Sequence, residues 1–282
     1  TIASLASLIR SELNFSSEGT SADYTQAIGV LDSKIFQTLV PIRSSGNNTS
    51  VFMFHSVGGN VLNYAKLAIG IDSSHPVYGF QSKGVDGLTE MDNSVEEMAS
   101  TYITEMKLIS PNGPFILCGG SMGGLLAIEV ALQLERAGDK VEKLIMFDTF
   151  GPNVDIKKLK DEGNNLIKNL KTSLYYRSMT IINKLRSSFM KGLGFPVPHN
   201  IRYFNIEMNN YKAMWKYKPD KYNGDLILFR APVDSSGWYS DPVMGWKEII
   251  QGDIKTISLK GAHSNFVEIN ELPSLLNKEI KD

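Results

Sequence analysis

The residues best suited to chemistry are a serine and its flanking glycines, in the sequence Gly119-Gly-Ser-Met-Gly123. The spacing G-x-S-x-G is that of a nucleophile elbow, in which a sharp strand-to-helix turn lifts a serine hydroxyl clear of the backbone. At such a corner a Cβ on Gly119 or Gly123 would clash with the crossing strand and helix. The pattern predicts Ser121 as a nucleophile. The structural alternative is a glycine-rich turn that only packs closely.

A nucleophilic serine needs a general base and an acid that orients this base. His263 is the natural base among the four histidines, because it follows the last strand expected in the core. Two aspartates qualify as the acid. Asp148 ends the strand after the elbow helix, and Asp234 follows a later strand. The order Ser121, Asp148, His263 is the Ser…Asp…His order of α/β-hydrolases.

Backbone N–H groups are expected to stabilise the oxyanion. Met122 supplies one, because its N–H lies at the start of the helix after the elbow. A second glycine-rich turn, at residues 56–60, supplies the other, for which Val57 is the candidate. His55 leads into this turn, which is then occupied by backbone donors, so we do not expect it to be the base. Cys118 lies inside a strand and is expected to be a small core residue.

The remaining histidines, His75 and His199, adjoin prolines and are expected to be structural residues in loops. No pair of histidines has the spacing of metal ligands.

These groups must be positioned by strands that alternate with helices. Short apolar runs typical of strands occur at residues 38–43, 51–55, 77–80, 115–118, 143–147, 225–229 and 254–259. Helical patterns occur at residues 61–69, 94–109, 125–136 and 200–217. This alternation predicts an α/β fold with a mostly parallel, doubly wound sheet, whose catalytic groups gather at the carboxyl ends of the strands. Residues 152–218 have helical patterns and no strand signal, which indicates a helical lid.

The composition excludes several classes of protein. The net charge of −1 over 282 residues argues against nucleic-acid binding. One cysteine excludes a disulfide framework and a thiolate zinc site, and it suits a cytoplasmic location. No apolar run is long enough for a membrane span. The chain begins without methionine or a signal-peptide pattern, so we expect it to be a piece of a longer protein.

With these residues in hand, the chain resembles a carboxy-terminal (type I) thioesterase domain of a nonribosomal peptide or polyketide synthase, with the α/β-hydrolase fold. The matching motifs cover about residues 38–275. They are Phe54-His-Ser-Val-Gly-Gly59, Cys118-Gly-Gly-Ser-Met-Gly-Gly124, Leu144-Ile-Met-Phe-Asp148 with Gly151-Pro152, Tyr217-Lys-Pro219 with Tyr222, Phe229-Arg-Ala231, Asp241-Pro-Val-Met-Gly-Trp246 and Gly261-Ala-His263. Releasing domains of this family usually place the acid at the position of Asp148. Free-standing editing thioesterases tend to use the position of Asp234.

The resemblance implies a function and a domain organisation. Residues 1–20 resemble the last helix and linker of a carrier domain, and residues 21–282 form the thioesterase domain, with a lid at about 152–218. The expected reaction releases an acyl or peptidyl chain from the phosphopantetheine thioester of a carrier domain, by hydrolysis or macrocyclisation. No cofactor is expected in this domain. The alternatives are a free-standing (type II, editing) thioesterase or carboxylesterase, or a non-catalytic domain of the same fold.

The lid region is rich in basic residues, with nine Lys or Arg against three acidic residues between Asp155 and Lys191. Its apolar stripe could roof an acyl channel, while its basic face could meet an acidic carrier domain. A solvated face on an amphipathic helix is the structural alternative.

Overall fold

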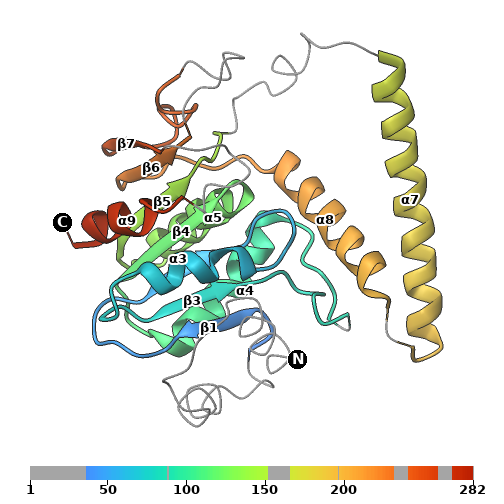
Figure 1. The fold of residues 1–282 in the computed structure, drawn as a ribbon, viewed down its shortest axis with the longest axis horizontal. Coiled ribbons are helices and arrows are strands. Elements are labelled where there is room, and N and C mark those ends of the chain that lie inside the picture. Colours follow the sequence, from blue (N-terminus) through green and yellow to red (C-terminus); the bar gives the residue numbers. More distant parts are fainter. Residues whose placement is uncertain are drawn as a thin grey trace.

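A central sheet of seven strands organises the chain (Figure 1). The computed structural model describes residues 36–87, 89–151, 166–195, 197–231, 241–259 and 269–281. The strand order is β1-β3-β2-β4-β5-β6-β7. Only β1 is antiparallel to its neighbour, and the other six strands are parallel. The strands are β1 (Leu39–Arg43), β2 (Val51–Phe54), β3 (Val77–Phe80), β4 (Phe115–Gly120), β5 (Val141–Phe147), β6 (Leu226–Arg230) and β7 (Ile254–Ser258).

Helices cover both faces of the sheet. Two hydrophobic clusters fill the layers: one packs α4 and α5 against the sheet, and the other packs α3 and α9 against its opposite face. The lid helices α7 and α8 extend to one side of this core (Figure 1). The helices are η1 (Leu62–Tyr64), α3 (Ala65–Gly70), α4 (Val95–Ile109), α5 (Met122–Arg136), α7 (Leu166–Gly192), α8 (His199–Lys216) and α9 (Leu272–Lys281).

Local sequence signals explain where several elements begin and end. The central strands β2, β3 and β4 are buried at every position, which is why they read as continuous apolar runs. At the start of α4, the Ser94 hydroxyl accepts a hydrogen bond from the Glu97 N–H over 3.1 Å. This side chain satisfies one of the N–H groups that a helix leaves unpaired at its start. Gly138, with φ +79°, follows the end of α5 as expected for a C-cap.

The predicted α/β fold with a mostly parallel, doubly wound sheet is confirmed. Strand β1 contains Pro41, which cannot donate a backbone hydrogen bond, and it lies at one edge of the sheet. The helical patterns expected at residues 152–218 lie, among the described residues, on α7 and α8, and α7 is one continuous helix of 27 residues. Helix α9 has no counterpart among the predicted elements. The carrier-domain remnant expected at residues 1–20 lies outside the described residues.

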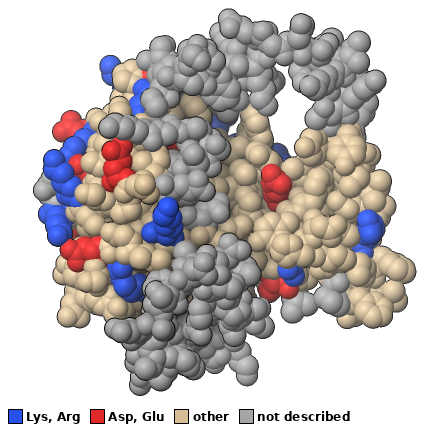
Figure 2. Space-filling view, in the orientation of Figure 1, with Lys and Arg blue, Asp and Glu red and all other residues tan. Residues whose placement is uncertain are grey.

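Helix α7 touches the rest of the lid through one of its faces. Tyr176 stacks on Phe204 of α8 with 6.4 Å between ring centroids, and the Asn205 side chain donates to the Ser187 hydroxyl over 2.9 Å. The other face exposes large apolar side chains, and the described part of this region is mostly uncharged in Figure 2. These side chains are Tyr175, Ile181, Ile182, Leu185 and Phe189.

Candidate active site

The corner between β4 and α5 has the strained geometry that the sequence pattern predicts. Ser121 occupies it with φ 54° and ψ −122°, a region that residues with side chains rarely adopt. A Cβ on Gly119 would overlap the backbone of Gly123, and a Cβ on Gly123 would overlap the Phe54 carbonyl. Helix α5 can therefore lie this close to the ends of β4 and β2 only because both positions are glycine.

The residue before the serine is held by Ser56 of the second glycine-rich turn and by Tyr64 of η1. The Gly120 N–H donates to the Tyr64 hydroxyl over 2.8 Å, and the Ser56 hydroxyl donates to the Gly120 carbonyl over 3.2 Å. Burial raises the pKa of Tyr64 to about 12, so the phenol stays protonated. Both polar groups of the Gly120 backbone are thus satisfied, which fixes the approach of the chain to Ser121.

Asp148 lies immediately beyond the neighbouring strand. Gly120 of β4 and Phe147 of β5 are partners in the sheet. Ser121 directly follows Gly120, and Asp148 directly follows Phe147. Asp148 is 4% exposed and has a positive φ of 43°. Its carboxylate accepts a hydrogen bond from the Ala231 N–H over 3.0 Å. The structure therefore brings two of the predicted site residues to the same edge of the sheet.

A second loop supports the turn that carries Asp148. The indole N–H of Trp246 donates to the Thr149 carbonyl over 2.8 Å, and the Gly151 N–H donates to the Met244 carbonyl over 2.8 Å. The supporting loop is itself closed by the Asp241 carboxylate, which accepts hydrogen bonds from two backbone N–H groups of its own turn. The Asp-Pro-Val-Met-Gly-Trp motif thus has a structural role beneath Asp148.

The two candidate oxyanion donors lie where the sequence placed them. Met122 is the first residue of α5, directly after Ser121. Val57 belongs to a tight turn in which the Gly59 N–H donates to the Ser56 carbonyl over 2.9 Å. Backbone N–H groups at a helix start and in a tight turn can both stabilise an anion.

His55 is a buried structural residue, which agrees with its rejection as the base. Its Nδ1 contacts the Ser56 carbonyl at 2.7 Å, and its Nε2 contacts the Tyr102 and Ser82 hydroxyls at 2.7 and 3.0 Å. Burial lowers the pKa of His55 to about 4, so the ring is neutral at pH 7. A carbonyl can only accept, so Nδ1 carries the proton.

The other singled-out residues have simpler roles or lie outside the described residues. His263 and the alternative acid Asp234 are in the second group. His75 is buried in a loop, as predicted, with Nδ1 2.8 Å from the Thr49 carbonyl. The prediction of a loop was wrong for His199, which is the first residue of α8. Cys118 is buried in β4, and this burial raises the pKa of its thiol.

Two observations bear on other kinds of site. Among the described residues, no group of His, Cys, Asp and Glu side chains could hold a metal ion. None of the described helices is long and apolar enough to cross a membrane.

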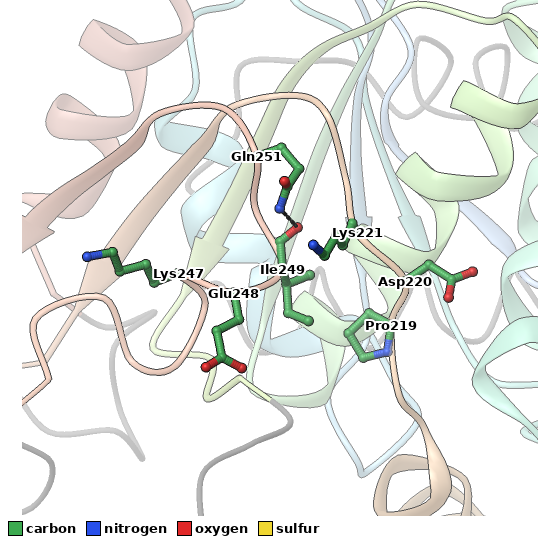
Figure 3. A pocket seen from close by; sticks show the side chains of 7 residues that line it. All are labelled: Pro219, Asp220, Lys221, Lys247, Glu248, Ile249 and Gln251. Carbon is green, nitrogen blue, oxygen red and sulfur yellow. Dashed lines mark hydrogen bonds between the residues drawn. The ribbon is translucent and has the colours of Figure 1, made fainter.

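A shallow hollow of about 620 Å³ lies away from Ser121. Figure 3 shows its lining, which comes from residues 219–221, 247–249 and 251. These segments precede β6 and β7, so the hollow lies at the amino ends of parallel strands. Ser121 and Asp148 follow the carboxyl ends, at the opposite edge. The hollow is therefore separate from the candidate catalytic residues.

Several residues that hold the site together could not be singled out from sequence patterns. Tyr64, Ser82 and Asn210 are buried and bond to the elbow or to the turn at Val57, and the buried Tyr102 bonds to the ring of His55, which precedes this turn. Each lies in a different element from the groups that it contacts. Only Tyr64 had a partial signal, because it occupies the helical segment directly after the second glycine-rich turn.

The fold and the elbow define an α/β-hydrolase. Within that class, residues 49–171 match the model of the family described as "Thioesterase domain". The chain is 29% identical over 252 residues to a dimodular nonribosomal peptide synthase of Bacillus subtilis, covering 84% of this chain and 10% of the relative. It is 33% identical over 276 residues to an atromentin synthetase of Suillus grevillei, covering 89% of this chain and 29% of the relative.

Solved structures agree in fold. The thioesterase domain NocB of the nocardicin cluster aligns with a TM-score of 0.63 and 18% identity, over 87% of this chain and 99% of that domain. The thioesterase domain that cyclises the lipopeptide surfactin aligns with a TM-score of 0.59 and 18% identity, over 87% and 96%. The resemblance to thioesterase domains of nonribosomal peptide synthetases is thus confirmed. The chain spans a tenth or less of several of the curated relatives that it matches.

Proposed function

We propose that this domain releases an acyl or peptidyl chain from a carrier-bound phosphopantetheine thioester through an acyl-enzyme on Ser121. The observation that carries the proposal is the strained corner at Ser121, which directly follows Gly120 of β4. Phe147, the partner of Gly120 on β5, is directly followed by Asp148. The thioesterase match and the synthetase relatives support the substrate class. A carrier domain is accordingly the proposed partner, and a cytoplasmic location remains a prediction.

The proposed reaction has two steps. His263 takes the Ser121 proton while Oγ attacks the thioester carbonyl, and the oxyanion rests on the Met122 and Val57 N–H groups. The C–S bond then breaks, the thiol leaves with the proton held by His263, and an acyl-enzyme remains. Water, or a hydroxyl or amine of the chain itself, next attacks the ester, which gives an acid or a ring. Asp148 fixes the imidazole tautomer and stabilises the imidazolium.

Kinetics with soluble thioesters test this proposal. A panel of acyl and dipeptidyl N-acetylcysteamine thioesters mimics the phosphopantetheine arm, and mass spectrometry of the product distinguishes acid from ring. Ser121→Ala should lower kcat by roughly a millionfold, as in other serine hydrolases that lose their nucleophile. A fluorophosphonate should label the wild type at Ser121 and leave this variant unlabelled. Release by Ser121→Ala at the wild-type rate would refute the scheme.

The free-standing thioesterase or carboxylesterase is the competing function. Comparison of the same acyl group as a thioester and as a p-nitrophenyl ester separates a thioesterase from a carboxylesterase. Preference for the thioester agrees with the proposal, and preference for the aryl ester favours the carboxylesterase.

A further inference from the structure

One side chain of the lid lies against the turn that presents Val57. Asn210 of α8 is 1% exposed, and its Nδ2 donates to the Val57 carbonyl over 2.9 Å and to the Ser82 hydroxyl over 3.0 Å. The same helix presses Ile206 against the turn, because a Cβ on Gly59 would approach the Ile206 side chain to 2.5 Å. The lid helix and the turn are therefore in direct contact at the second candidate oxyanion donor.

The protonation of His55 and the backbone carbonyls decide which groups donate and which accept hydrogen bonds around this turn. The Ser56 carbonyl accepts from His55, so Nδ1 is the protonated nitrogen of the neutral ring and Nε2 is an acceptor. The Ser82 hydroxyl can donate to this Nε2 and accept from the Asn210 amide. The Val57 carbonyl can only accept, so it must receive an N–H of the Asn210 amide, which a carboxylate could not supply.

This arrangement holds the peptide units on both sides of Val57. The Ser56 carbonyl and the Val57 N–H belong to one planar peptide unit, so they point in opposite directions. His55 and the Gly59 N–H hold that carbonyl, and thereby aim the Val57 N–H away from them. Asn210 holds the next peptide unit through the Val57 carbonyl.

We propose that Asn210 is a positioning residue, which couples the lid helix α8 to the oxyanion site by fixing the direction of the Val57 N–H. This inference rests on the proposed function, in which Val57 is the second oxyanion donor. A lid that carries Asn210 away from the turn would leave the Val57 peptide held on one side only. Lid position and transition-state stabilisation are then linked through one amide.

The chain offers a matched pair of variants for the test. Asn210→Asp keeps the shape of the side chain but removes the N–H donors. Asn209→Asp makes the same change at the next residue of α8, where the amide donates to the Asp92 carbonyl over 2.7 Å and does not bond the turn. The readouts are kcat and KM for a thioester of the panel, the inhibition constant of an alkyl boronic acid, and the melting temperature. The boronate forms a tetrahedral adduct on serine and so reports on the oxyanion site.

We expect Asn210→Asp to lower kcat about tenfold to a hundredfold. This decrease in kcat should not exceed the decrease caused by removing a whole oxyanion donor. KM should change by less than about threefold, since a positioning role acts on the transition state. The boronate inhibition constant should rise by the factor by which kcat/KM falls. Asn209→Asp should stay within about twofold of the wild type in kcat, KM and the boronate inhibition constant.

Ser82→Ala is the second variant, to be used if Asn210→Asp does not fold. It removes the hydroxyl between Asn210 and His55. Its kcat/KM should fall, and its boronate inhibition constant should rise, by the same factor of about threefold to tenfold.

The outcomes separate this inference from the proposed function. A folded Asn210→Asp that matches Asn209→Asp in kcat and boronate inhibition overturns the positioning role, and so does an unchanged Ser82→Ala if Asn210→Asp is unfolded. A wild type that neither cleaves thioesters nor reacts with a fluorophosphonate instead overturns the proposed function.

Discussion

The Ser121 N–H donates to the carbonyl of Phe147 over 3.1 Å, so the serine is bonded directly to the last residue of the strand that leads into Asp148. The nucleophile candidate and the acid candidate are therefore fixed relative to each other by the sheet itself. Side chains held by rigid elements keep their geometry better than side chains on loops alone. This bond is a structural reason to favour Asp148 as the acid, because the position of Asp148 is set by the same ladder as the elbow.

Paired substitutions of the two aspartates test which one is the acid. Asp148→Asn should lower kcat by roughly ten-thousandfold, since the amide would favour the wrong tautomer of the base. Asp234→Asn should leave kcat within a few-fold of the wild type. Steady-state kinetics with one thioester measures both. If the large loss falls on Asp234→Asn, the acid is at the later position and Asp148 is structural.

Glycine at the elbow should be required for folding as well as for turnover. In Gly123→Ala the new methyl would overlap the Phe54 carbonyl, so backbone must shift. We expect the free energy of unfolding in urea to fall by about 1–3 kcal/mol. Gly192→Ala is the matched control, because a Cβ there meets nothing within 4 Å. It should be neutral or stabilising by up to about 1 kcal/mol. Equal stability of the two variants would contradict the close crossing at the elbow.

The phenol of Tyr64 should contribute to both stability and rate. Tyr64→Phe removes the acceptor of the Gly120 N–H and leaves that group buried without its partner. Such a loss costs about 1–3 kcal/mol of unfolding free energy, and kcat should fall because Gly120 directly precedes Ser121. Tyr175→Phe on α7 is the control, since Tyr175 is 58% exposed. Urea unfolding and thioester kinetics on both variants check the prediction. No change in Tyr64→Phe would mean that Gly120 finds another partner.

Much of the fold was predictable because local signals are strong there. The buried strands are continuous apolar runs, and the capping serine at Ser94 and the glycine at Gly138 mark helix ends. The order of the motifs then implied parallel strands with Ser121 and Asp148 at one edge. The continuity of α7 could not be predicted, because amphipathic spacing shows that a segment is helical without showing where one helix stops. Helix α7 has no glycine or proline between its first and last residues.

The contacts that support the site could not be predicted because they join distant parts of the chain. Asn210 and the Val57 carbonyl are 153 residues apart, and Tyr217 donates to the Glu129 carboxylate of α5 across 88 residues. A buried asparagine on a helix has no sequence pattern that names its partner. Trp246 illustrates the same limit: its motif supported the family resemblance, but its bond to the Thr149 carbonyl appears only in the fold.

Protonation of His55 should make the domain less stable in acid. Its folded pKa of about 4 lies below the usual value of 6.5, so the unfolded chain binds more protons between these values. The stability that His55 contributes is thus present above pH 6.5 and is lost as the pH falls toward 4. Between pH 7 and pH 5 the loss is about 2 kcal/mol. Urea unfolding at both pH values should show a fall that is smaller by about this amount in His55→Gln. An equal fall in both proteins would show that His55 does not titrate in this way.

The exposed apolar face of α7 should affect the KM for long acyl substrates and leave the free energy of unfolding unchanged. Leu185 and Phe189 are 66% and 68% exposed, so Leu185→Ser and Phe189→Ser should change the unfolding free energy by less than about 0.5 kcal/mol. If this face roofs the acyl chain, each variant should raise KM severalfold for a long acyl thioester and leave KM for an acetyl thioester unchanged, because only a long chain reaches the lid. Leu108→Ser on α4 is the control, since Leu108 is 56% exposed and belongs to the core layer. It should leave both KM values unchanged. If this face is only solvated, Leu185→Ser and Phe189→Ser should have the same KM values as the Leu108→Ser control for both the long acyl thioester and the acetyl thioester.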